Sequence, residues 1–232
     1  MTDAPAGGWT TGRIIELNRP SDTLVQLRFH VDDRVDHLPG QHYVVRLRAP
    51  DGYTAQRSYS VASDPDDPLL ELMVECLPGG EVSGFLHDVA EVGDELELRG
   101  PIGGWFVWEG DVPAVAVAGG SGVVPIVAMT RYARRLGLQD RLKVVVVART
   151  WQDLPYAAEL QRYGAFIALT RENLDGRVAA PPYPAEMAAY VAGAERAYVC
   201  GSVGFATFAT RLLGESGVLA DTIRVEQFGE TG

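Results

Sequence analysis

The chain has 232 residues, of which 47% are hydrophobic and 22% are charged, proportions typical of a globular protein. This length accommodates one large domain or two of about 100–130 residues, each with its own core. The formal net charge of −11 offers no general attraction to phosphate backbones, which argues against a nucleic-acid binder.

Several other classes of protein are excluded by features that the sequence lacks. No run of about 18 apolar residues occurs, so no transmembrane helix is expected. The first residues lack the basic and apolar regions of a secretory signal, so a cytoplasmic protein is expected. The two cysteines, Cys76 and Cys200, are too few for a four-cysteine iron–sulfur or zinc site within this chain. No metal site is expected from the histidines, because no metal-ligand spacing relates His30, His37, His42 and His87.

The first half of the chain has short apolar runs interrupted by proline, glycine and aspartate. Five runs, with room for a sixth, have the length and spacing of strands: residues 23–31, 42–49, 57–63, 69–77 and 94–101. Residues 83–89 indicate one short helix between the last two. Such closely spaced short strands predict an antiparallel sandwich or barrel.

After about residue 110 the rhythm changes to buried strands that alternate with helices. The expected strands are residues 114–120, 142–148, 165–170, 197–201 and 222–228. The expected helices are residues 123–136, 153–164, 185–193 and 204–217. This alternation predicts βαβ units and a parallel sheet with helices on both faces. We therefore expect two domains, residues 1–110 and 111–232.

A glycine-rich turn, Gly119-Gly120-Ser121-Gly122, joins the first strand of the second half to its first helix. Glycines let the backbone approach a pyrophosphate closely, and a helix start offers free N–H donors. The spacing differs from the G-x-G-x-x-G fingerprint, and an ordinary tight turn is the alternative.

Polar residues follow the other strands of the expected parallel sheet, at the edge where such sheets bind ligands. Arg149 and Thr150 follow the second strand, and Arg171 and Arg177 follow the third. Arginines at this edge of an acidic chain suit the 2′-phosphate of NADP. The alternative for each of them is a solvated surface side chain.

The first half carries two further clusters. Residues 57–63, "RSYSVAS", put a cation, a phenol and three hydroxyls into one strand. Gly79, Gly80 and Ser83 precede the short helix, which makes a second glycine-to-helix transition and a second possible diphosphate cradle. Two such sites in one chain suggest two nucleotide cofactors.

Together these motifs resemble the ferredoxin–NADP reductase superfamily over nearly the whole chain. Its R-x-Y-S flavin signature is matched by Arg57, Tyr59 and Ser60. Its other motifs are matched in order by Gly79, Gly80, Val82 and Ser83, by Gly100-Pro101-Ile102-Gly103, by Gly119 to Pro125 with Ser121 in place of threonine, by Cys200-Gly201, and by Glu226 with Phe228. The resemblance implies a Greek-key barrel that binds FAD, followed by a doubly wound, five-stranded α/β domain that binds NADPH or NADH.

The resemblance also implies roles for the residues of the flavin signature. Arg57 would pair with the FAD pyrophosphate, Tyr59 would lie against the isoalloxazine, and Ser60 would hydrogen-bond near N5. Strict strand alternation, however, puts Arg57 and Tyr59 on one face and Ser60 on the other. All three contact one ligand only if the strand bends near Ser60 or the ligand wraps around it.

Three residues of the second domain receive implied roles near the reacting rings. Cys200 would sit beside the nicotinamide, with a buried structural cysteine as the alternative. Glu226 would be a proton conduit near the flavin edge, with an exposed strand residue as the alternative. Phe228 would approach the flavin face, although it replaces the terminal tyrosine of the plant-type pattern and four residues follow it.

The complete expected site therefore assigns catalysis to Ser60, Cys200 and Glu226. The cofactor-binding residues are expected to be Arg57, Ser58, Tyr59, Ser60, Val74, Gly79, Gly80, Val82, Ser83, Gly120, Ser121, Gly122, Pro125, Arg149, Thr150, Arg171, Arg177, Cys200, Gly201 and Phe228.

The implied activity is hydride transfer from NADPH or NADH to FAD, followed by electron transfer to a separate acceptor. Ferredoxin, flavodoxin or an oxygenase component fits that role, and the protein is expected to be a stand-alone monomeric module. A local basic patch for an acidic partner has the candidates Arg13, Arg19, Arg46 and Arg48. The alternatives are a reductase of free flavin or small molecules, and a non-catalytic flavin subunit of a larger complex.

Overall fold

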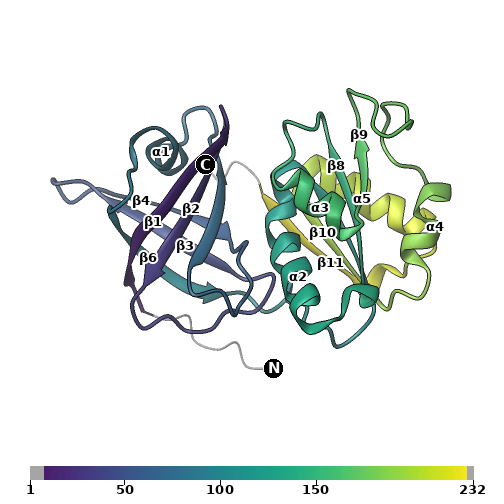
Figure 1. Cartoon of the computed structure of the whole chain (residues 1–232), viewed down its shortest axis with the longest axis horizontal. Coiled ribbons are helices and arrows are strands. Elements are labelled where there is room, and N and C mark those ends of the chain that lie inside the picture. The colour runs from purple at the N-terminus through teal and green to yellow at the C-terminus, as the bar shows by residue number, and fades with distance from the viewer. Residues whose placement is uncertain (1–7, 229–232) are drawn as a thin grey trace. The chain divides into compact units, whose positions relative to one another are not determined.

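The computed structural model describes residues 8–228, and it separates into two compact units that divide between Val107 and Trp108 (Figure 1). The boundary expected near Gly110 lies a few residues beyond this division. Within residues 8–228 no helix is long and apolar enough to cross a membrane.

The first unit is a six-stranded antiparallel sheet in the order β4-β3-β6-β1-β2-β5. Its strands are β1 (Thr10–Ser21), β2 (Leu24–Val31), β3 (His42–Arg48), β4 (Thr54–Ser60), β5 (Leu70–Glu75) and β6 (Glu95–Ile102). Beyond β4, Val61 bridges Leu72 of β5, and the Ala62 N–H donates to the Glu71 carbonyl at 2.8 Å. The two edge strands therefore meet, which closes the sheet into a barrel.

The barrel core follows from strand alternation. Along β2, the side chains of Val25, Leu27 and Phe29 are completely buried, while the residues between them are partly exposed. A short helix, α1 (Glu81–Gly84), continues into one π-helical segment, η1 (Phe85–Val89), and contributes Val82 and Leu86 to the same core. These contacts fix the helix against the barrel.

The first strand, β1, was not among the five strand-like runs in the sequence. Only Gly12 and Ile14 of its twelve residues are buried, so its apolar alternation is short. Register shifts interrupt its pairing with β2 at Ile14/Glu16 and at Asn18/Ser21. A bulged and largely exposed strand gives little periodic signal, which is why the pattern did not reveal it.

The second unit is a five-stranded parallel sheet in the order β11-β10-β7-β8-β9. Its strands are β7 (Ala114–Gly119), β8 (Leu142–Ala148), β9 (Phe166–Leu169), β10 (Arg196–Ser202) and β11 (Ile223–Phe228). Its α-helices are α2 (Val123–Leu136), α3 (Ala157–Tyr163), α4 (Pro184–Val191) and α5 (Val203–Glu215). The prediction of an antiparallel barrel followed by a doubly wound parallel sheet is confirmed.

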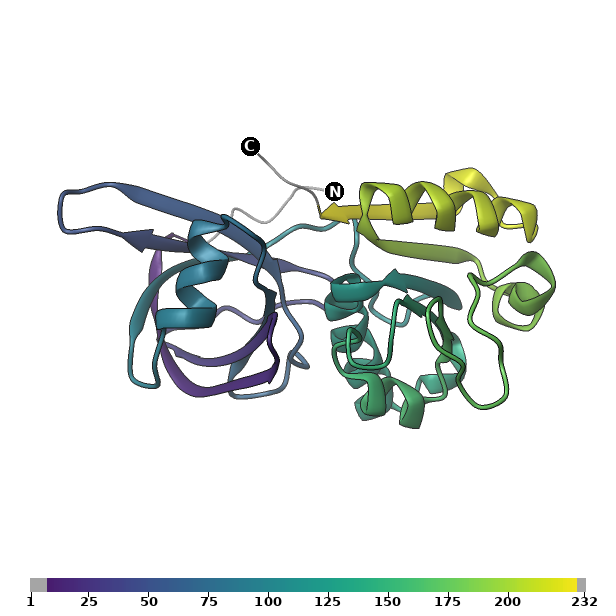
Figure 2. The ribbon, with the colours of Figure 1, turned by 90° about the horizontal axis from the view of Figure 1, so that it is seen from above.

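The helices cover both faces of this sheet, as Figure 2 shows for the yellow α5 above it and the teal α2 below. Val115, Val117 and Val199 pack with α4 and α5. The intervening Ala114, Ala116 and Ala118 of β7 present small side chains to the other face. The α3 helix begins at Ala157, later than expected, because Tyr156 before it has a left-handed backbone with φ 60°.

The connections create a switch point beside the central strand β7. The chain passes from β7 to β8 and β9 on one side, and then returns to place β10 and β11 on the other. In open α/β sheets the crevice for a ligand lies at the carboxyl ends of the strands where this reversal occurs. The ends of β7 and β10 are therefore the expected binding position.

Candidate cofactor-binding sites

The "RSYSVAS" stretch, residues 57–63, has an accessible first half at the end of β4 and a buried second half after it. Arg57 and Ser58 are exposed and Tyr59 is half-buried. From Ser60 onward four successive residues are buried, because β4 ends at Ser60 and the chain crosses to β5 at Val61. Alternation therefore ends at Ser60, which lies where the chain turns into the barrel wall.

The Ser60 hydroxyl is the least satisfied group of this stretch. Its Oγ is buried and has no hydrogen-bond partner among the described residues. Leaving such a hydroxyl unpaired costs about 1–3 kcal/mol, so a partner from a ligand would be favourable. Ser63, in contrast, is structural, because its Oγ accepts a hydrogen bond from the Glu71 N–H at 3.0 Å.

Arg57 and Tyr59 lie on the same face of β4 as Ala55, whose side chain packs on the barrel core with that of Tyr59. Burial raises the pKa of the Tyr59 phenol, and the Arg57 charge opposes this shift. One Arg57 guanidinium nitrogen donates to the Gln56 carbonyl at 2.8 Å, and its other donors have no partner within residues 8–228. An exposed cation beside a half-buried ring fits a ligand that carries both phosphate and an aromatic system.

The start of α1 lies close to this strand. The Tyr53 hydroxyl donates to the Glu81 carboxylate at 2.9 Å, which ties the β3–β4 hairpin to the first turn of the helix. A side chain on Gly80 would place its Cβ 2.3 Å from the Ser83 Oγ and 3.1 Å from the Leu77 carbonyl oxygen. The Ser83 hydroxyl in turn accepts from the Leu77 N–H at 3.3 Å. The segment is therefore a tight backbone turn that only glycine at position 80 permits.

The remaining residues expected to contact FAD have different surroundings. Val74 of β5 and Val82 of α1 are buried in the barrel core. Gly79 is exposed and has a left-handed φ of +74° with open space around its Cα. The structure thus gathers Arg57, Tyr59 and the Gly79–Ser83 turn around β4 and α1, while Val74 and Val82 support them from within.

In the second unit, the Gly119–Gly122 turn lies at the switch point of the sheet. A Cβ on Gly122 would lie 2.3 Å from the Cys200 carbonyl oxygen and 2.6 Å from its carbon, so the ends of β7 and β10 are in direct contact. Gly120 has φ +55° with nothing within 4 Å of a built Cβ, and no side chain caps the start of α2. Ser121 is half-buried beside it, and Pro125 is buried in the first turn of α2. An open, uncapped helix start of this kind suits a pyrophosphate.

The three arginines expected at this edge divide into two groups. The Arg171 N–H donates to the Arg149 carbonyl at 2.9 Å, which places these two exposed residues side by side after β9 and β8. Neither guanidinium has a hydrogen-bond or ion-pair partner in the part of the chain that the structure describes. Thr150 instead closes a local turn, since its hydroxyl donates to Asp153 at 2.8 Å.

Arg177 does not join Arg149 and Arg171. Its guanidinium makes a forked ion pair with Glu186, at 2.8 and 3.0 Å, and donates to the carbonyls of Ala180 and Pro181. The side chain is only 17% exposed. The phosphate role expected for Arg177 therefore conflicts with its engagement by Glu186 of α4 and by the carbonyls of its own loop. Of the three expected arginines, Arg149 and Arg171 keep unpaired guanidinium groups among the described residues.

Cys200 and Glu226 are direct partners in the register of β10 and β11. Cys200 is completely buried, and burial together with the Glu226 charge raises the pKa of its thiol. Burial also raises the pKa of the half-buried Glu226 carboxyl to about 7. Gly201 is buried beside Cys200, and Phe228, opposite Ser202, is half-buried as the last described residue.

The arginines proposed for a basic patch are mostly neutralised. Arg13 pairs with Glu95 at 2.6 Å, and Arg46 makes a forked pair with Glu97 at 2.7 and 2.8 Å. Arg48 approaches the same Glu97 at 3.6 Å. Arg19 donates to the backbone carbonyls of His87 and Ala90. These residues hold the barrel surface together and do not form an open cationic face.

Sequence spacing missed one side-chain cluster in the first unit. Cys76, His87 and Asp88 each bring one potential ligand atom within 4.8 Å of the others. Cys76 follows β5, whereas the other two lie in η1, so only the fold brings them together. Histidine spacing alone contained no signal for this cluster.

One family model matches most of the first unit. Residues 12–107 match the oxidoreductase FAD-binding domain family. Over 139 residues the chain is 33% identical to the 2-halobenzoate 1,2-dioxygenase electron transfer component of Burkholderia cepacia, a match that covers 59% of this chain and 40% of that protein. The chain spans about half the length, or less, of the first curated relatives that it matches.

Solved structures share the fold of both units. The flavohaem-like FAD/NAD-binding domain of nitric oxide dioxygenase from Vibrio cholerae O1 biovar El Tor has a TM-score of 0.83 at 22% identity, with 95% of this chain and 98% of that chain covered. A ferredoxin NADP⁺ reductase from Neisseria gonorrhoeae, solved with bound FAD and NADP, has a TM-score of 0.79 at 16% identity and covers 95% and 99% of the two chains.

Proposed function

We propose that the chain is a member of the ferredoxin–NADP reductase superfamily and an FAD-dependent oxidoreductase, which the family match of residues 12–107 and the shared fold support. It takes hydride from NADPH or NADH and passes electrons to a separate acceptor protein. The observation that carries this proposal is the unpartnered, buried Ser60 hydroxyl at the end of a strand that also presents Arg57 and Tyr59. The FAD-binding family match covers this strand.

Each group of the barrel site has a proposed task. The Arg57 guanidinium binds the FAD pyrophosphate, and the N–H groups at the Gly79–Ser83 turn add donors. Tyr59 lies against the flavin ring and excludes water from it. Ser60 donates a hydrogen bond near N5 and thereby satisfies its buried hydroxyl. FAD, when bound, supplies the chemistry that accepts a hydride and releases electrons one at a time.

The second unit is proposed to bind the reduced nicotinamide. The Gly119–Gly122 turn and the start of α2 hold its pyrophosphate, while Cys200 and Gly201 border the nicotinamide from the end of β10. Arg149 and Arg171 are the cations available for a 2′-phosphate, which favours NADPH as the donor. Glu226, whose carboxyl has a pKa of about 7, can hold or release a proton near neutral pH.

The proposed acceptor is the oxygenase component of a multi-protein system. This choice is supported by a curated relative that is itself named as the electron transfer component of a dioxygenase. Ferredoxin and flavodoxin are the other protein acceptors of the same chemical class. We further propose that the protein is a monomer and that it works in the reducing cytoplasm, where free thiols such as those of both cysteines persist.

The test uses the tag-free full chain, saturated with FAD and freed of unbound flavin. NADPH or NADH is the donor, and ferricyanide or cytochrome c is the one-electron acceptor. The proposal predicts many turnovers with either acceptor and no added flavin. Turnover that occurs only when free flavin is added would instead identify a free-flavin reductase. A chain that binds FAD but accepts no electrons from either donor would be a non-catalytic subunit.

A further inference from the structure

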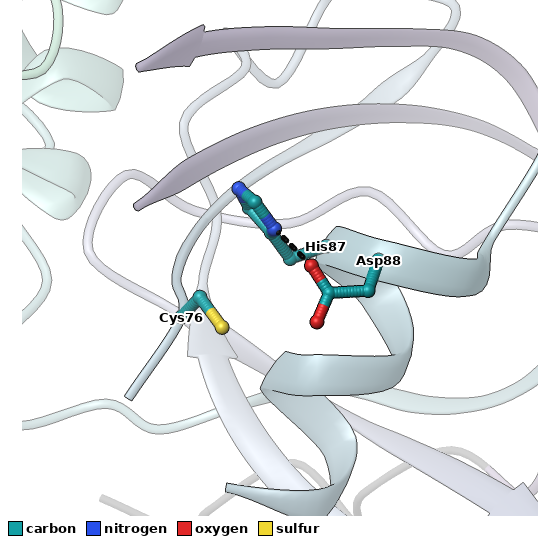
Figure 3. Close-up of side chains that lie close together, drawn as sticks. All are labelled: Cys76, His87 and Asp88. Carbon is teal, nitrogen blue, oxygen red and sulfur yellow. Dashed lines mark hydrogen bonds and ion pairs between the residues drawn. The ribbon is translucent and has the colours of Figure 1, made fainter. Parts of the chain in front are cut away.

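The cluster of Cys76, His87 and Asp88 closes the far end of the α1–η1 helix onto the end of β5. Figure 3 shows the sulfur, the near ring nitrogen and the carboxylate around a common space. The His87 Nδ1 and the Asp88 Oδ1 are 2.7 Å apart, and all three ligand atoms lie within 4.8 Å of one another. The three residues come from two segments, so the arrangement is a product of the fold.

The backbone under the cluster is firmly held, whereas its polar groups are incompletely satisfied. Arg19 of β1 donates to the His87 carbonyl at 2.6 Å and to the Ala90 carbonyl at 3.3 Å. The His87 side chain is 13% exposed, and its Nε2 is buried without a hydrogen-bond partner in residues 8–228. Asp88, at 68% exposure, keeps the cluster open to solvent on one side.

We propose that Cys76, His87 and Asp88 form a three-ligand site for a divalent transition metal of the Zn²⁺ type. One thiolate, one imidazole and one carboxylate are ligands that zinc accepts, with water in the fourth position. Tetrahedral ligands at about 2.0–2.3 Å from zinc lie about 3.3–3.8 Å from each other. The observed cluster reaches this geometry through side-chain adjustments on the order of 1 Å.

A reactive thiol is the competing interpretation of a cysteine beside histidine and aspartate. Nucleophilic cysteines lie in electropositive surroundings that lower the thiol pKa. Around Cys76, burial and the Asp88 charge act in the opposite direction and raise it. A bound cation would reverse this effect, since a coordinating thiol is deprotonated by the metal.

Bound metal would link the segments on both sides of the Gly79–Ser83 turn. Cys76 precedes this turn and His87 follows it, so the metal would connect the end of β5 with η1. A ligand that binds only the folded state stabilises that state by mass action. A metal held by both segments binds only when they are folded together, so it would stabilise the folded chain. This site does not depend on the proposed redox activity.

The test is titration calorimetry of the tag-free full chain with ZnCl₂, combined with zinc-edge X-ray absorption. We expect one site per chain, with one sulfur and otherwise nitrogen or oxygen neighbours. Cys76→Ser and Asp88→Asn should each weaken binding at least about tenfold, and zinc should raise the melting temperature of the wild type.

The matched control is His30→Gln. His30 also faces a carboxylate, with its Nδ1 3.4 Å from Asp32, but this pair is exposed. Its replacement should leave zinc binding unchanged. The proposal is overturned if the wild type binds no zinc, if Cys76→Ser binds it as tightly, or if absorption shows no sulfur neighbour. The absorption measurement needs no variant, so it decides the matter even if a substitution impairs folding.

Discussion

At the scale of single residues, the three hydroxyls between Arg57 and Ser63 have three different environments. Ser58 is exposed, Ser60 is buried without a partner among the described residues, and Ser63 accepts a backbone hydrogen bond from Glu71. The difference arises because the chain leaves β4 at Ser60 and crosses to β5. The side chains of residues 54–59 alternate between the two faces of β4. Ser60 departs from this pattern because the strand ends there.

Replacing Arg57 with alanine should weaken FAD binding about 10- to 100-fold, because a charge-assisted hydrogen bond contributes about 1.5–3 kcal/mol. The FAD affinity of Arg57→Lys should lie between those of the wild type and Arg57→Ala, since lysine retains the charge but not the forked hydrogen-bond donors. The dissociation constant is measured by fluorescence quenching of added FAD. Arg13→Ala is the control, because Arg13 pairs with Glu95 on the barrel surface. Equal FAD affinity in Arg57→Ala and wild type would remove Arg57 from the site.

Glu226 should make stability depend on pH. Its carboxyl pKa is raised by burial from 4.5 to about 7, so the folded chain binds this proton more tightly than the unfolded chain. The contribution to stability is present below about 4.5 and is lost as pH rises through about 7. The melting temperature of Glu226→Gln, relative to wild type, should therefore increase between pH 5 and pH 8. Glu75→Gln, at an exposed position, is the control variant. A melting-temperature difference between Glu226→Gln and wild type that stays constant with pH would refute the raised pKa of Glu226.

At the scale of elements, the contact between the ends of β7 and β10 depends on Gly122. A Cβ there would meet the Cys200 carbonyl at 2.3 Å, and backbone atoms cannot move aside as a flexible side chain can. Gly122→Ala should destabilise the fold by about 1–3 kcal/mol and raise the KM for the nicotinamide donor. FAD occupancy should be retained.

The control for this variant is Gly204→Ala in α5. Nothing lies within 4 Å of a Cβ at Gly204, and alanine favours helix, so this variant should be neutral or slightly stabilised. Both are compared by thermal unfolding and steady-state kinetics. A Gly122→Ala variant with an unchanged melting temperature and KM would show that the two strand ends do not need this close approach.

The elements of the second unit were the most predictable from sequence. Runs such as Val144–Val147 are buried on both faces, so they stand out without any knowledge of their partners. The β1 strand was not recognised, because bulges and exposure erase its alternation. The periodic pattern of apolar residues reveals which side chains are buried. An exposed strand is held by backbone pairing with its neighbours, which leaves no such pattern in the sequence.

Sequence motifs predicted the backbone turns of the candidate sites but not the partners of their side chains. Gly80 and Gly122 are required by local turns and close contacts, which sequence motifs encode. Arg149 and Arg177 look alike in sequence, yet one is free within the described residues and the other is held by Glu186. Such side-chain partnerships depend on tertiary placement, and so does the meeting of Cys76 with His87.

At the scale of the whole molecule, the preference for NADPH over NADH tests whether Arg149 and Arg171, and not Arg177, bind the 2′-phosphate. The double variant Arg149→Ala/Arg171→Ala should lower kcat/KM for NADPH at least about 100-fold, because each of the two lost charged contacts removes about 1.5–3 kcal/mol. The value for NADH should change little. Arg177→Ala should instead lower the melting temperature, since it leaves the largely buried Glu186 without its partner. A wild-type preference for NADH would contradict the assignment of Arg149 and Arg171.

The central claim is that one chain binds FAD and reduces it with a nicotinamide donor. The most direct measurement is the visible absorbance of the purified full chain under anaerobic conditions, before and after addition of NADPH or NADH. We expect about one FAD per chain, with its absorbance bleached by an equimolar amount of donor within the mixing time of the experiment. A chain that takes up no FAD, or whose bound FAD stays oxidised with both donors, would contradict the account.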